Sequence, residues 1–286
     1  MPARTSTIPI AVTGATGRLG GRVARHLADA GVPQRLLVRE PSRAQRFPGA
    51  DVAQADYEDG AGVRRALTGV GTVFMVSAPE TPDRVAQHRS FIDAARAAGV
   101  GHLVYLSFYG ASPTATFTLA RDHAATEEHI RASGLSFTFL RDNLYADFLP
   151  SMVGPDGVLR GPAGEGRAAA VTQKDIAEVA ATVLRAPGTH TGATYDLTGP
   201  QALTLADVAA AIGAAGGREV TYHPETEAEA YASRAVFRAP DWQVEAWVST
   251  YLAIARGEMD GVSNTIPRLL GRPATCLADL LAGEAH

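Results

Sequence analysis

The stretch Ile8-Pro-Ile-Ala-Val-Thr-Gly-Ala-Thr-Gly-Arg-Leu-Gly20 decides the fold predicted for this 286-residue chain. Ile8, Ile10 and Val12 form a short apolar, β-branched run that is typical of a buried strand. A helix is expected to begin near Arg18. The stretch therefore predicts a strand, a tight glycine turn and the N-terminus of a helix.

Each of the three glycines in this stretch has a distinct expected role. Gly14 permits the sharp turn, Gly17 lets the backbone approach a pyrophosphate, and Gly20 allows close packing of helix against strand. The phosphates would bind the free N–H groups at the positive end of the helix dipole. The spacing G-x-x-G-x-x-G is one residue longer in its first gap than the usual dinucleotide fingerprint, so a purely structural glycine turn in another α/β protein is the alternative.

Strand and helix patterns alternate through the first half of the chain. The further expected strands are Gln34–Val38, Ala50–Gln54, Thr72–Val76, His102–Leu106 and Ser136–Leu140, and the expected helices are Leu19–Ala30, Pro41–Phe47, Asp59–Leu67, Asp83–Ala98 and Leu119–Ala132. This alternation predicts a Rossmann-type, doubly wound parallel sheet of the α/β class. Functional residues are then expected at the carboxyl ends of the strands.

The pattern changes in the last third of the chain. Helices are expected at Gln173–Leu184 and Leu205–Ala215, and strands at Gly157–Arg160, Thr194–Leu197 and Glu219–Tyr222. We therefore predict an NADP-binding Rossmann core at 1–150 and a smaller, mixed but mainly helical substrate-binding lobe at 151–286. Some C-terminal segments are expected to return to the sheet.

Composition excludes several classes of protein. The net charge is −4 and the pI about 6.1, without a cluster of basic and aromatic residues, so no nucleic-acid partner is expected. The single cysteine, Cys276, excludes an internal disulfide, and the eight scattered histidines predict no metal site. Residues 1–7 lack the apolar core of a signal peptide and there is no run of 18 apolar residues, which predicts a cytoplasmic protein with no membrane contact.

Arg39, at the end of the second predicted strand, stands where dinucleotide-binding folds contact the adenosine ribose. An arginine there can pair with a 2′-phosphate, which favours NADP, and Arg43 could support it. Glu40 could turn inward instead, and a solvated Arg39 is the alternative.

Two further strand ends carry candidate cofactor contacts. Asp56 and Tyr57 are expected near the adenine, and Ser77, Ala78 and Pro79 beside the ribose and pyrophosphate, where small residues let a cofactor pass close to the backbone. Asp56 is equally plausible as a turn residue or helix cap.

Several motifs together resemble one family. They are TGATGRLG at 13–20, LVR at 37–39, QADY at 54–57, QHR at 87–89, YLS at 105–107, His123 with Thr126 and Glu127, LR at 140–141 followed by Asn143 and Tyr145, residues 171–177, and YDLTG at 195–199. The combination resembles the NmrA-like atypical short-chain dehydrogenases, and within them the NADPH-dependent type 2 quinone oxidoreductase branch. The resemblance implies NADPH bound by the glycine turn and Arg39, and a pocket between the two lobes where a quinone meets the nicotinamide. The expected cofactor-binding residues are Gly14, Thr16, Gly17, Arg18, Leu19, Gly20, Arg39, Asp56, Tyr57, Ser77, Ala78, Pro79, Ser107 and Arg141.

The chain lacks the tyrosine and lysine pair of ordinary short-chain dehydrogenases. Its only lysine is Lys174, and the residue four positions before it is Ala170. Alcohol–ketone chemistry, which uses the lysine to lower the pKa of the tyrosine, is therefore disfavoured. Quinone reduction tolerates the absence better, because the hydroquinone anion is weakly basic and the main requirement is positioning of the ring.

Four residues near the ends of the fifth and sixth strands are candidate catalytic proton donors. They are Tyr109, His123, Asn143 and Tyr145. A structural histidine at 123 and core packing of Tyr145 are the alternatives. Asp175 is expected to cap or orient a helix and Lys174 to be solvated.

These observations lead to an expected function with two competitors. The first is an NADPH-dependent oxidoreductase that transfers hydride to a quinone or a similar conjugated carbonyl. The second is an NADP(H)-binding, redox-sensing regulator of the NmrA type, without turnover, that contacts a partner protein. A biosynthetic reductase or isomerase is the third. The expected partner is a small, quinone-like molecule, and a second copy of the chain is a candidate partner.

Overall fold

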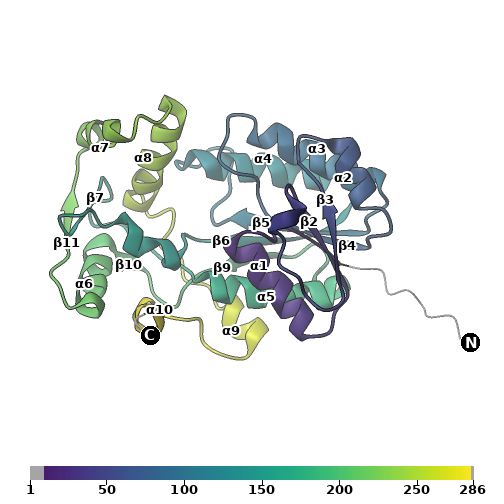
Figure 1. The fold of residues 1–286 in the computed structure, drawn as a ribbon. Coiled ribbons are helices and arrows are strands. Elements are labelled where there is room, and N and C mark those ends of the chain that lie inside the picture. Colours follow the sequence, from purple (N-terminus) through teal and green to yellow (C-terminus); the bar gives the residue numbers. More distant parts are fainter. Residues whose placement is uncertain (1–9, 285–286) are drawn as a thin grey trace, which may run out of the picture. The chain divides into compact units, whose positions relative to one another are not determined.

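The computed structural model describes residues 10–284, and its centre is a seven-stranded sheet (Figure 1). The strands are β1 (Ile10–Thr13), β2 (Gln34–Val38), β3 (Ala50–Gln54), β4 (Thr72–Met75), β5 (His102–Phe108), β6 (Ser136–Asp142) and β9 (Thr194–Leu197), in the order β3-β2-β1-β4-β5-β6-β9. All four residues of β1 are buried, as expected for a central strand of a parallel sheet. Ile8, which the sequence assigns to this strand, lies outside the described residues.

The strands run parallel, which confirms the predicted Rossmann-type α/β class. In the register of the sheet, Val12 of β1 pairs with Leu36 on one side and Phe74 on the other. At the far edge, the N–H of Phe139 donates to the carbonyl of Ala193 (2.9 Å) and the N–H of Asn143 to that of Leu197 (3.0 Å), so β9 advances in step with β6. A C-terminal segment therefore does return to the sheet.

Five helices connect or flank these strands: α1 (Arg18–Asp29), α2 (Gly60–Ala66), α3 (Arg84–Ala97), α4 (Thr118–Ser133) and α5 (Gln173–Arg185). Their bounds lie within one or two residues of those predicted. The helix predicted at Pro41–Phe47 is wrong beyond its first turn, because only a short 3-10 helix, η1 (Pro41–Arg43), forms there. Ala44 already has extended backbone (φ −69°, ψ 131°), which ends the turn.

The chain divides into two compact units, each made of three stretches. The first comprises the described part of 1–107 together with 125–140 and 176–195, and the second comprises 108–124, 141–175 and 196–286 as far as it is described. The division thus differs from a single boundary near residue 150, because the chain passes between the units at several points along β5, α4, β6, α5 and β9. The core of the first unit includes Phe91, Tyr105 and Phe139, all fully buried.

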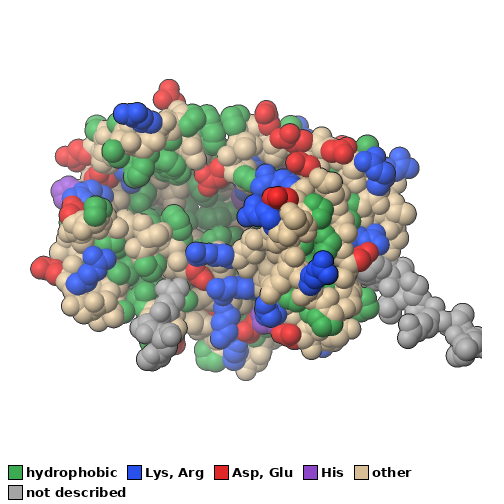
Figure 2. All heavy atoms as spheres, in the orientation of Figure 1, with side chains coloured by type: hydrophobic (Ala, Val, Ile, Leu, Met, Phe, Trp, Pro, Cys, Tyr) green, Lys and Arg blue, Asp and Glu red, His purple; other side chains and the backbone are tan. Residues whose placement is uncertain are grey.

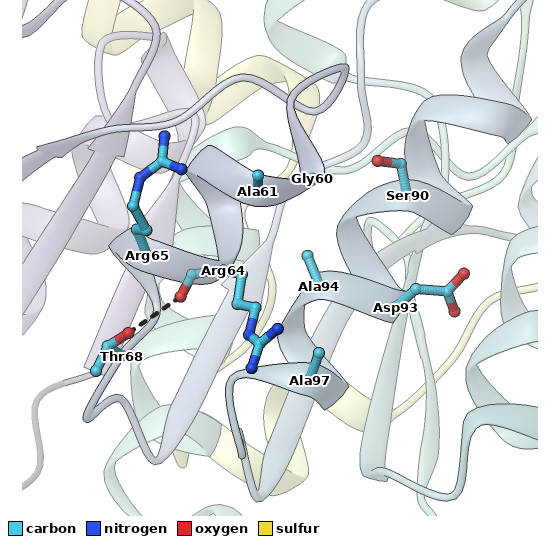
Figure 3. Close-up of a pocket in the computed structure, with 9 residues that line it drawn as sticks. All are labelled: Gly60, Ala61, Arg64, Arg65, Thr68, Ser90, Asp93, Ala94 and Ala97. Carbon is cyan, nitrogen blue, oxygen red and sulfur yellow. Dashed lines mark hydrogen bonds between the residues drawn. The ribbon is translucent and has the colours of Figure 1, made fainter.

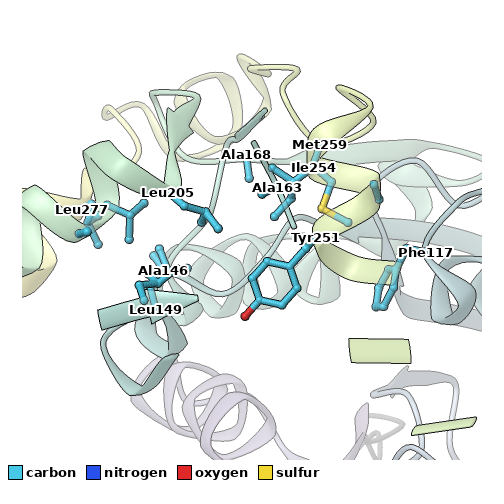
Figure 4. Packing of buried hydrophobic residues seen from close by; sticks show 14 of the residues in the cluster. Phe117, Ala146, Leu149, Ala163, Ala168, Leu205, Tyr251, Ile254, Met259 and Leu277 are labelled. Atoms are coloured by element: carbon cyan, nitrogen blue, oxygen red, sulfur yellow. The ribbon is translucent and has the colours of Figure 1, made fainter. Parts of the chain in front are cut away.

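The second unit contains short strands and most of the C-terminal helices. Its elements are η2 (Ala146–Met152), β7 (Val158–Gly161), β8 (Arg167–Ala168), β10 (Leu203–Thr204), α6 (Leu205–Gly216), β11 (Thr221–Pro224), α7 (Glu227–Arg234), η4 (Ala235–Phe237), α8 (Asp241–Ala255), α9 (Thr265–Leu270) and α10 (Leu277–Glu284); the remaining 3-10 helix, η3 (Pro187–His190), belongs to the first unit. β7 pairs with β11 in parallel and β8 with β10 in antiparallel orientation. Figure 4 shows the apolar core of this unit, in which Leu149, Tyr251 and Met259 take part.

Asp175, at the start of α5, does not cap its own helix. Its carboxylate is fully buried and accepts hydrogen bonds from the backbone N–H (2.7 Å) and hydroxyl (3.0 Å) of Thr275, and Arg272 lies 2.8 Å away. The hydroxyl of Thr172 instead accepts a hydrogen bond from the N–H of Asp175 (3.1 Å), as an N-cap residue does. Asp175 therefore anchors the segment before α10, while Lys174 is exposed as predicted.

Substitution of Gly20 by alanine tests the close packing at the start of α1. A Cβ atom there would lie 2.7 Å from the carbonyl oxygen of Thr13 and would also overlap the carbonyl of Gly14. Because backbone cannot yield as a flexible side chain does, we expect Gly20→Ala to lower the free energy of unfolding by about 1–3 kcal/mol in urea denaturation. Gly188→Ala is the control, because no described atom lies within 4 Å of the added Cβ, and equal effects of the two substitutions would contradict the role of Gly20 in close packing.

Candidate functional site

The candidate site lies in the first unit, at the carboxyl ends of β1 and β4. Within the sheet, β2 is the neighbour of β1 on one edge and β4 is its neighbour on the other, so the strand order reverses direction at β1. Such a reversal of strand order opens a crevice in which α/β proteins bind ligands. Gly14 (φ +63°) makes the turn that follows β1, and a Cβ there would stand 3.2 Å from the Cβ of Val76, which follows β4. The glycine turn and the end of β4 therefore flank this crevice together.

The N-terminus of α1 has the features of an anion site. Gly17 occupies the N-cap position, and among the described residues no side chain caps the helix and no acidic residue occurs in its first turn. The N–H of Gly17 donates to the carbonyl of Gly14 (2.9 Å), which closes the turn. The first N–H groups of α1 have no side-chain cap among the described residues, and a phosphate would satisfy them.

A pocket of about 240 Å³ beside this turn is rich in arginine. Its lining residues are Ala15, Thr16, Gly17, Arg18, Gly21, Arg22, Arg25, Arg43 and Gln45. In Figure 2, basic side chains lie over the part of the face where Figure 1 places α1 and the end of β2. Guanidinium groups bind phosphate oxygens in a bidentate geometry, so this pocket suits a phosphate group. Arg22 and Arg25 were not among the predicted site residues, although their spacing from Arg18 by one and two helical turns places all three on one face of α1.

Arg39 follows β2 and is exposed, but it does not line this pocket. Its carbonyl accepts a hydrogen bond from Nε2 of Gln54 (3.1 Å). Glu40 lies near Arg43 (3.9 Å) and accepts a hydrogen bond from the hydroxyl of Ser42 (3.3 Å). Glu40, the acidic residue that could have turned inward beside Arg39, therefore contacts residues of η1.

Asp56 and Tyr57 already have protein partners. The carboxylate of Asp56 accepts a hydrogen bond from the N–H of Glu58 (3.2 Å), as a turn residue does, and its side chain is exposed. The Tyr57 hydroxyl donates to the carbonyl of Val76 (2.7 Å) and lies 2.8 Å from Oγ1 of Thr13. Burial raises the pKa of Tyr57 well above its usual value. Tyr57 thus ties the end of β4 to the end of β1, and its contact with adenine stays a prediction.

The loop of residues 76–79, which follows β4, is held from α3. The N–H of Ala78 donates to Nε2 of His88 (2.8 Å), and the carbonyl of Ala78 accepts a hydrogen bond from Nε of Arg84 (3.0 Å). Both side chains are buried. The sequence predicted Ala78 as a cofactor contact but gave no role to the two residues that fix its backbone.

Ser107, near the end of β5, is fully buried and donates to Oε1 of Glu127 (2.6 Å). Oε2 of the same carboxylate accepts a hydrogen bond from Arg131 (3.0 Å). The hydroxyl hydrogen of Ser107 is therefore committed to a buried, paired carboxylate. Arg141, the last of the predicted cofactor residues, belongs to the second unit and is partly buried.

The four candidate proton donors all belong to the second unit. Tyr109 and Asn143 directly follow β5 and β6, each of which runs two residues beyond its predicted end, and the N–H of Tyr109 donates to the carbonyl of Asp142 (2.8 Å). His123 is buried with its ring 6.1 Å from that of Phe108, and Tyr145 is partly buried.

Asn143 and Tyr109 differ in how far the protein engages them. The Asn143 carboxamide is buried, donates to the carbonyl of Met259 (2.9 Å) and accepts a hydrogen bond from the N–H of Leu144 (2.8 Å). Tyr109 is partly buried, and burial, together with the charges of Asp196 and Asp260, raises its pKa. The phenol therefore stays protonated at neutral pH and can serve as a hydrogen-bond donor.

A larger groove of about 700 Å³ lies between α2 and α3 (Figure 3). It is lined by small residues such as Gly60, Ala61, Ala94 and Ala97, with Arg64 and Asp93 beside them, and by none of the predicted site residues.

Residues 10–284 hold neither a candidate metal site nor a helix that could span a membrane. No group of three His, Cys, Asp or Glu side chains in this part of the chain is arranged to hold a metal ion. Within the same residues, every helix is too short or too polar to cross a membrane.

The chain belongs to the NmrA-like family, whose model matches residues 6–251, and this confirms the predicted family. It is 36% identical to quinone oxidoreductase 2 of Escherichia coli over 94% of this chain and 96% of that protein. It is 33% identical to the NAD(P)H azoreductase of Xenophilus azovorans over 96% of this chain and 98% of the relative. The crystal structure of the NADPH-dependent quinone oxidoreductase from Escherichia coli in complex with NADPH superimposes with a TM-score of 0.88, at 35% identity over 97% of this chain and all of that one.

The imidazole of His88 should remain neutral far below the usual pKa of histidine. Burial, and then the charge of Arg84, lower its pKa from 6.5 to about 3. Because the unfolded chain takes up this proton at higher pH than the folded one, stability is lost as the pH falls from 6.5 toward 3. The loss should be at most about 1.4 kcal/mol per pH unit.

NMR titration of the histidine ring nitrogens measures the pKa of His88 directly. The difference in unfolding free energy between wild type and His88→Gln, across the same pH range, separates the contribution of His88 from that of the other histidines. A midpoint for His88 near 6.5 would contradict the assignment.

Proposed function

We propose that this chain is an NADPH-dependent reductase that transfers hydride to a quinone or a similar conjugated carbonyl. One observation carries the proposal: the uncapped N-terminus of α1 and an arginine-lined pocket of about 240 Å³ adjoin the crevice between β1 and β4. The helix end suits a pyrophosphate and the arginines suit a further phosphate, which together match the phosphate groups of NADPH.

The comparisons confirm the predicted oxidoreductase class and NADP(H) as the cofactor. Relatives at 33–36% identity are named as an oxidoreductase and as an NAD(P)H-dependent azoreductase, and a structural neighbour at 35% identity is complexed with NADPH. The backbone cradle of Gly14, Gly17 and Gly20 fits this group, because Gly14 takes the positive φ of a tight turn and a Cβ on Gly20 would meet the backbone of residues 13 and 14.

A quinone is the proposed acceptor because the chain has no tyrosine with a lysine four positions later. Bound NADPH supplies the hydride, and the product oxygen of a quinone is a weakly basic phenolate that needs only one proton from water or a neutral donor. The protein's task is then to position the planar ring rather than to supply a strong acid. We infer that Tyr109 is the donor to test first, since it follows β5 directly and its side chain is only partly buried.

Purified protein should oxidise NADPH in the presence of benzoquinones and naphthoquinones, measured by the loss of nicotinamide absorbance. Tyr109→Phe should lower kcat by about tenfold or more if its phenol donates the proton, and a loss of that size in Tyr145→Phe alone would assign the donor role to Tyr145 instead. Failure of every quinone would contradict the quinone assignment. Turnover of azo dyes alone would move the substrate to that class, and tight NADP(H) binding without any turnover would favour the redox sensor.

Replacement of the arginines near the glycine turn should alter cofactor preference. Arg39→Ala and Arg43→Ala should each weaken NADPH relative to NADH by about 1.5–3 kcal/mol where a charged hydrogen bond to the 2′-phosphate is lost. Arg96→Ala removes the same charge from an exposed position in the last turn of α3. Arg96 does not line the arginine-rich pocket, so this variant serves as control. Dissociation constants from calorimetry are the measurement, and an unchanged NADPH to NADH ratio in both variants would refute the 2′-phosphate assignment.

A further inference from the structure

The loop of residues 76–79, called here the 76–79 loop, is fixed at its first residue by the end of β1. The N–H of Val76 donates to Oγ1 of Thr13 (2.8 Å), and the carbonyl of Val76 accepts a hydrogen bond from Tyr57 (2.7 Å). Thr13 is the residue immediately before Gly14. The loop therefore begins in a fixed relation to the glycine turn, on the other side of the crevice.

The third residue of the loop is fixed by α3. Arg84 and His88 lie one helical turn apart on the buried face of α3, and they bind the carbonyl and the N–H of Ala78 respectively (3.0 and 2.8 Å). Ser77, Ala78 and Pro79 have short side chains with little packing area of their own. The position of this backbone consequently depends on hydrogen bonds rather than on the packing of its side chains.

Only one protonation state of His88 can make its two bonds. A backbone N–H can only donate, so Nε2 of His88 must carry no hydrogen, and the ring hydrogen resides on Nδ1. Nδ1 lies 2.8 Å from Oγ1 of Thr126 on α4, which accepts that hydrogen. The rings of Tyr57 and Tyr105 contact the imidazole edge to face, with centroids 6.3 and 5.9 Å away, and hold its plane.

We propose that His88 is a positioning residue for the cofactor, and that the affinity for NADPH depends on its Nε2 holding the amide of Ala78. The inference rests on the proposed function, because it takes the 76–79 loop as backbone that the dinucleotide contacts. A cofactor that passes close to backbone is sensitive to shifts of under an ångström in that backbone. Loss of the acceptor would leave the Ala78 amide unpaired and free the loop to move, while the glycine turn stays intact.

Two near-isosteric substitutions separate the acceptor from the rest of the side chain. His88→Gln places an amide oxygen near the former position of Nε2 and retains an acceptor for Ala78. His88→Asn reaches only as far as the former Nδ1, so it can bond Thr126 but not Ala78. We expect the dissociation constant for NADPH, measured by calorimetry, to rise about tenfold or more in His88→Asn and to stay within about threefold of wild type in His88→Gln.

Amide hydrogen exchange of Ala78 provides a readout that needs no cofactor. Exchange should accelerate at least tenfold in His88→Asn and remain near the wild-type rate in His88→Gln. His129→Asn, a change of the same kind at a partly exposed residue of α4 that bonds Asp93, is the control and should leave both measurements unchanged. Equal NADPH affinities in the two His88 variants, whether both weakened or both normal, would overturn the inference.

A second pair of variants applies where His88→Asn does not fold. Thr126→Val removes the acceptor that fixes the imidazole tautomer, whereas Thr126→Ser retains the hydroxyl. We expect a weaker affinity for NADPH in Thr126→Val alone, and equal affinities in the pair would overturn the inference. Wild-type protein that fails to bind NADPH would refute the proposed function and the inference with it, whereas normal wild-type binding with indifferent variants refutes the inference alone.

Discussion

The rest of the first unit depends on one constraint: β1 must turn sharply into α1 while lying next to β4. Gly14 satisfies it with a positive φ, and the side chain of Val76 occupies the space that a Cβ there would enter. Thr13 and Tyr57 then tie the two strand ends together through Val76. Because this junction places an uncapped helix end beside a fixed loop, the same interactions that stabilise the sheet also shape its candidate ligand crevice.

The strand and helix pattern was predictable because it depends on local chemistry. Alternating apolar runs, and glycines that end helices, are visible in the sequence, and the helix expected at Pro41–Phe47 was wrong beyond its first turn. The strand predicted at Glu219–Tyr222 forms two residues later, at Thr221–Pro224, where its register is set by pairing with β7. Such pairing is a tertiary effect that a local pattern does not contain.

The candidate site was predictable only where the backbone itself is the functional group. The turn formed by glycines 14, 17 and 20 can be recognised in the sequence, and their contact with a pyrophosphate stays a prediction. The positions of Arg22, Arg25, Arg84 and His88 could not be predicted, because arginine on a helix is usually solvated and a lone histidine usually structural. Asp175 shows the same limit: the partners of its buried carboxylate, Thr275 and Arg272, are about a hundred residues away in the sequence. Contacts between residues so far apart in the sequence depend on how the whole chain is folded. The sequence predicted only the class of fold and not these contacts.

The way the chain alternates between its two compact units has a practical consequence. The boundaries fall after residues 107, 124, 140, 175 and 195, so neither unit is a continuous piece of the chain. Strands β5, β6 and β9 and helices α4 and α5 each contribute to both units. A gene fragment that encodes one unit alone therefore cannot be made by simple truncation. A cut at any of these boundaries would pass through a strand or a helix, so engineered exchange of parts between relatives has to keep both units together.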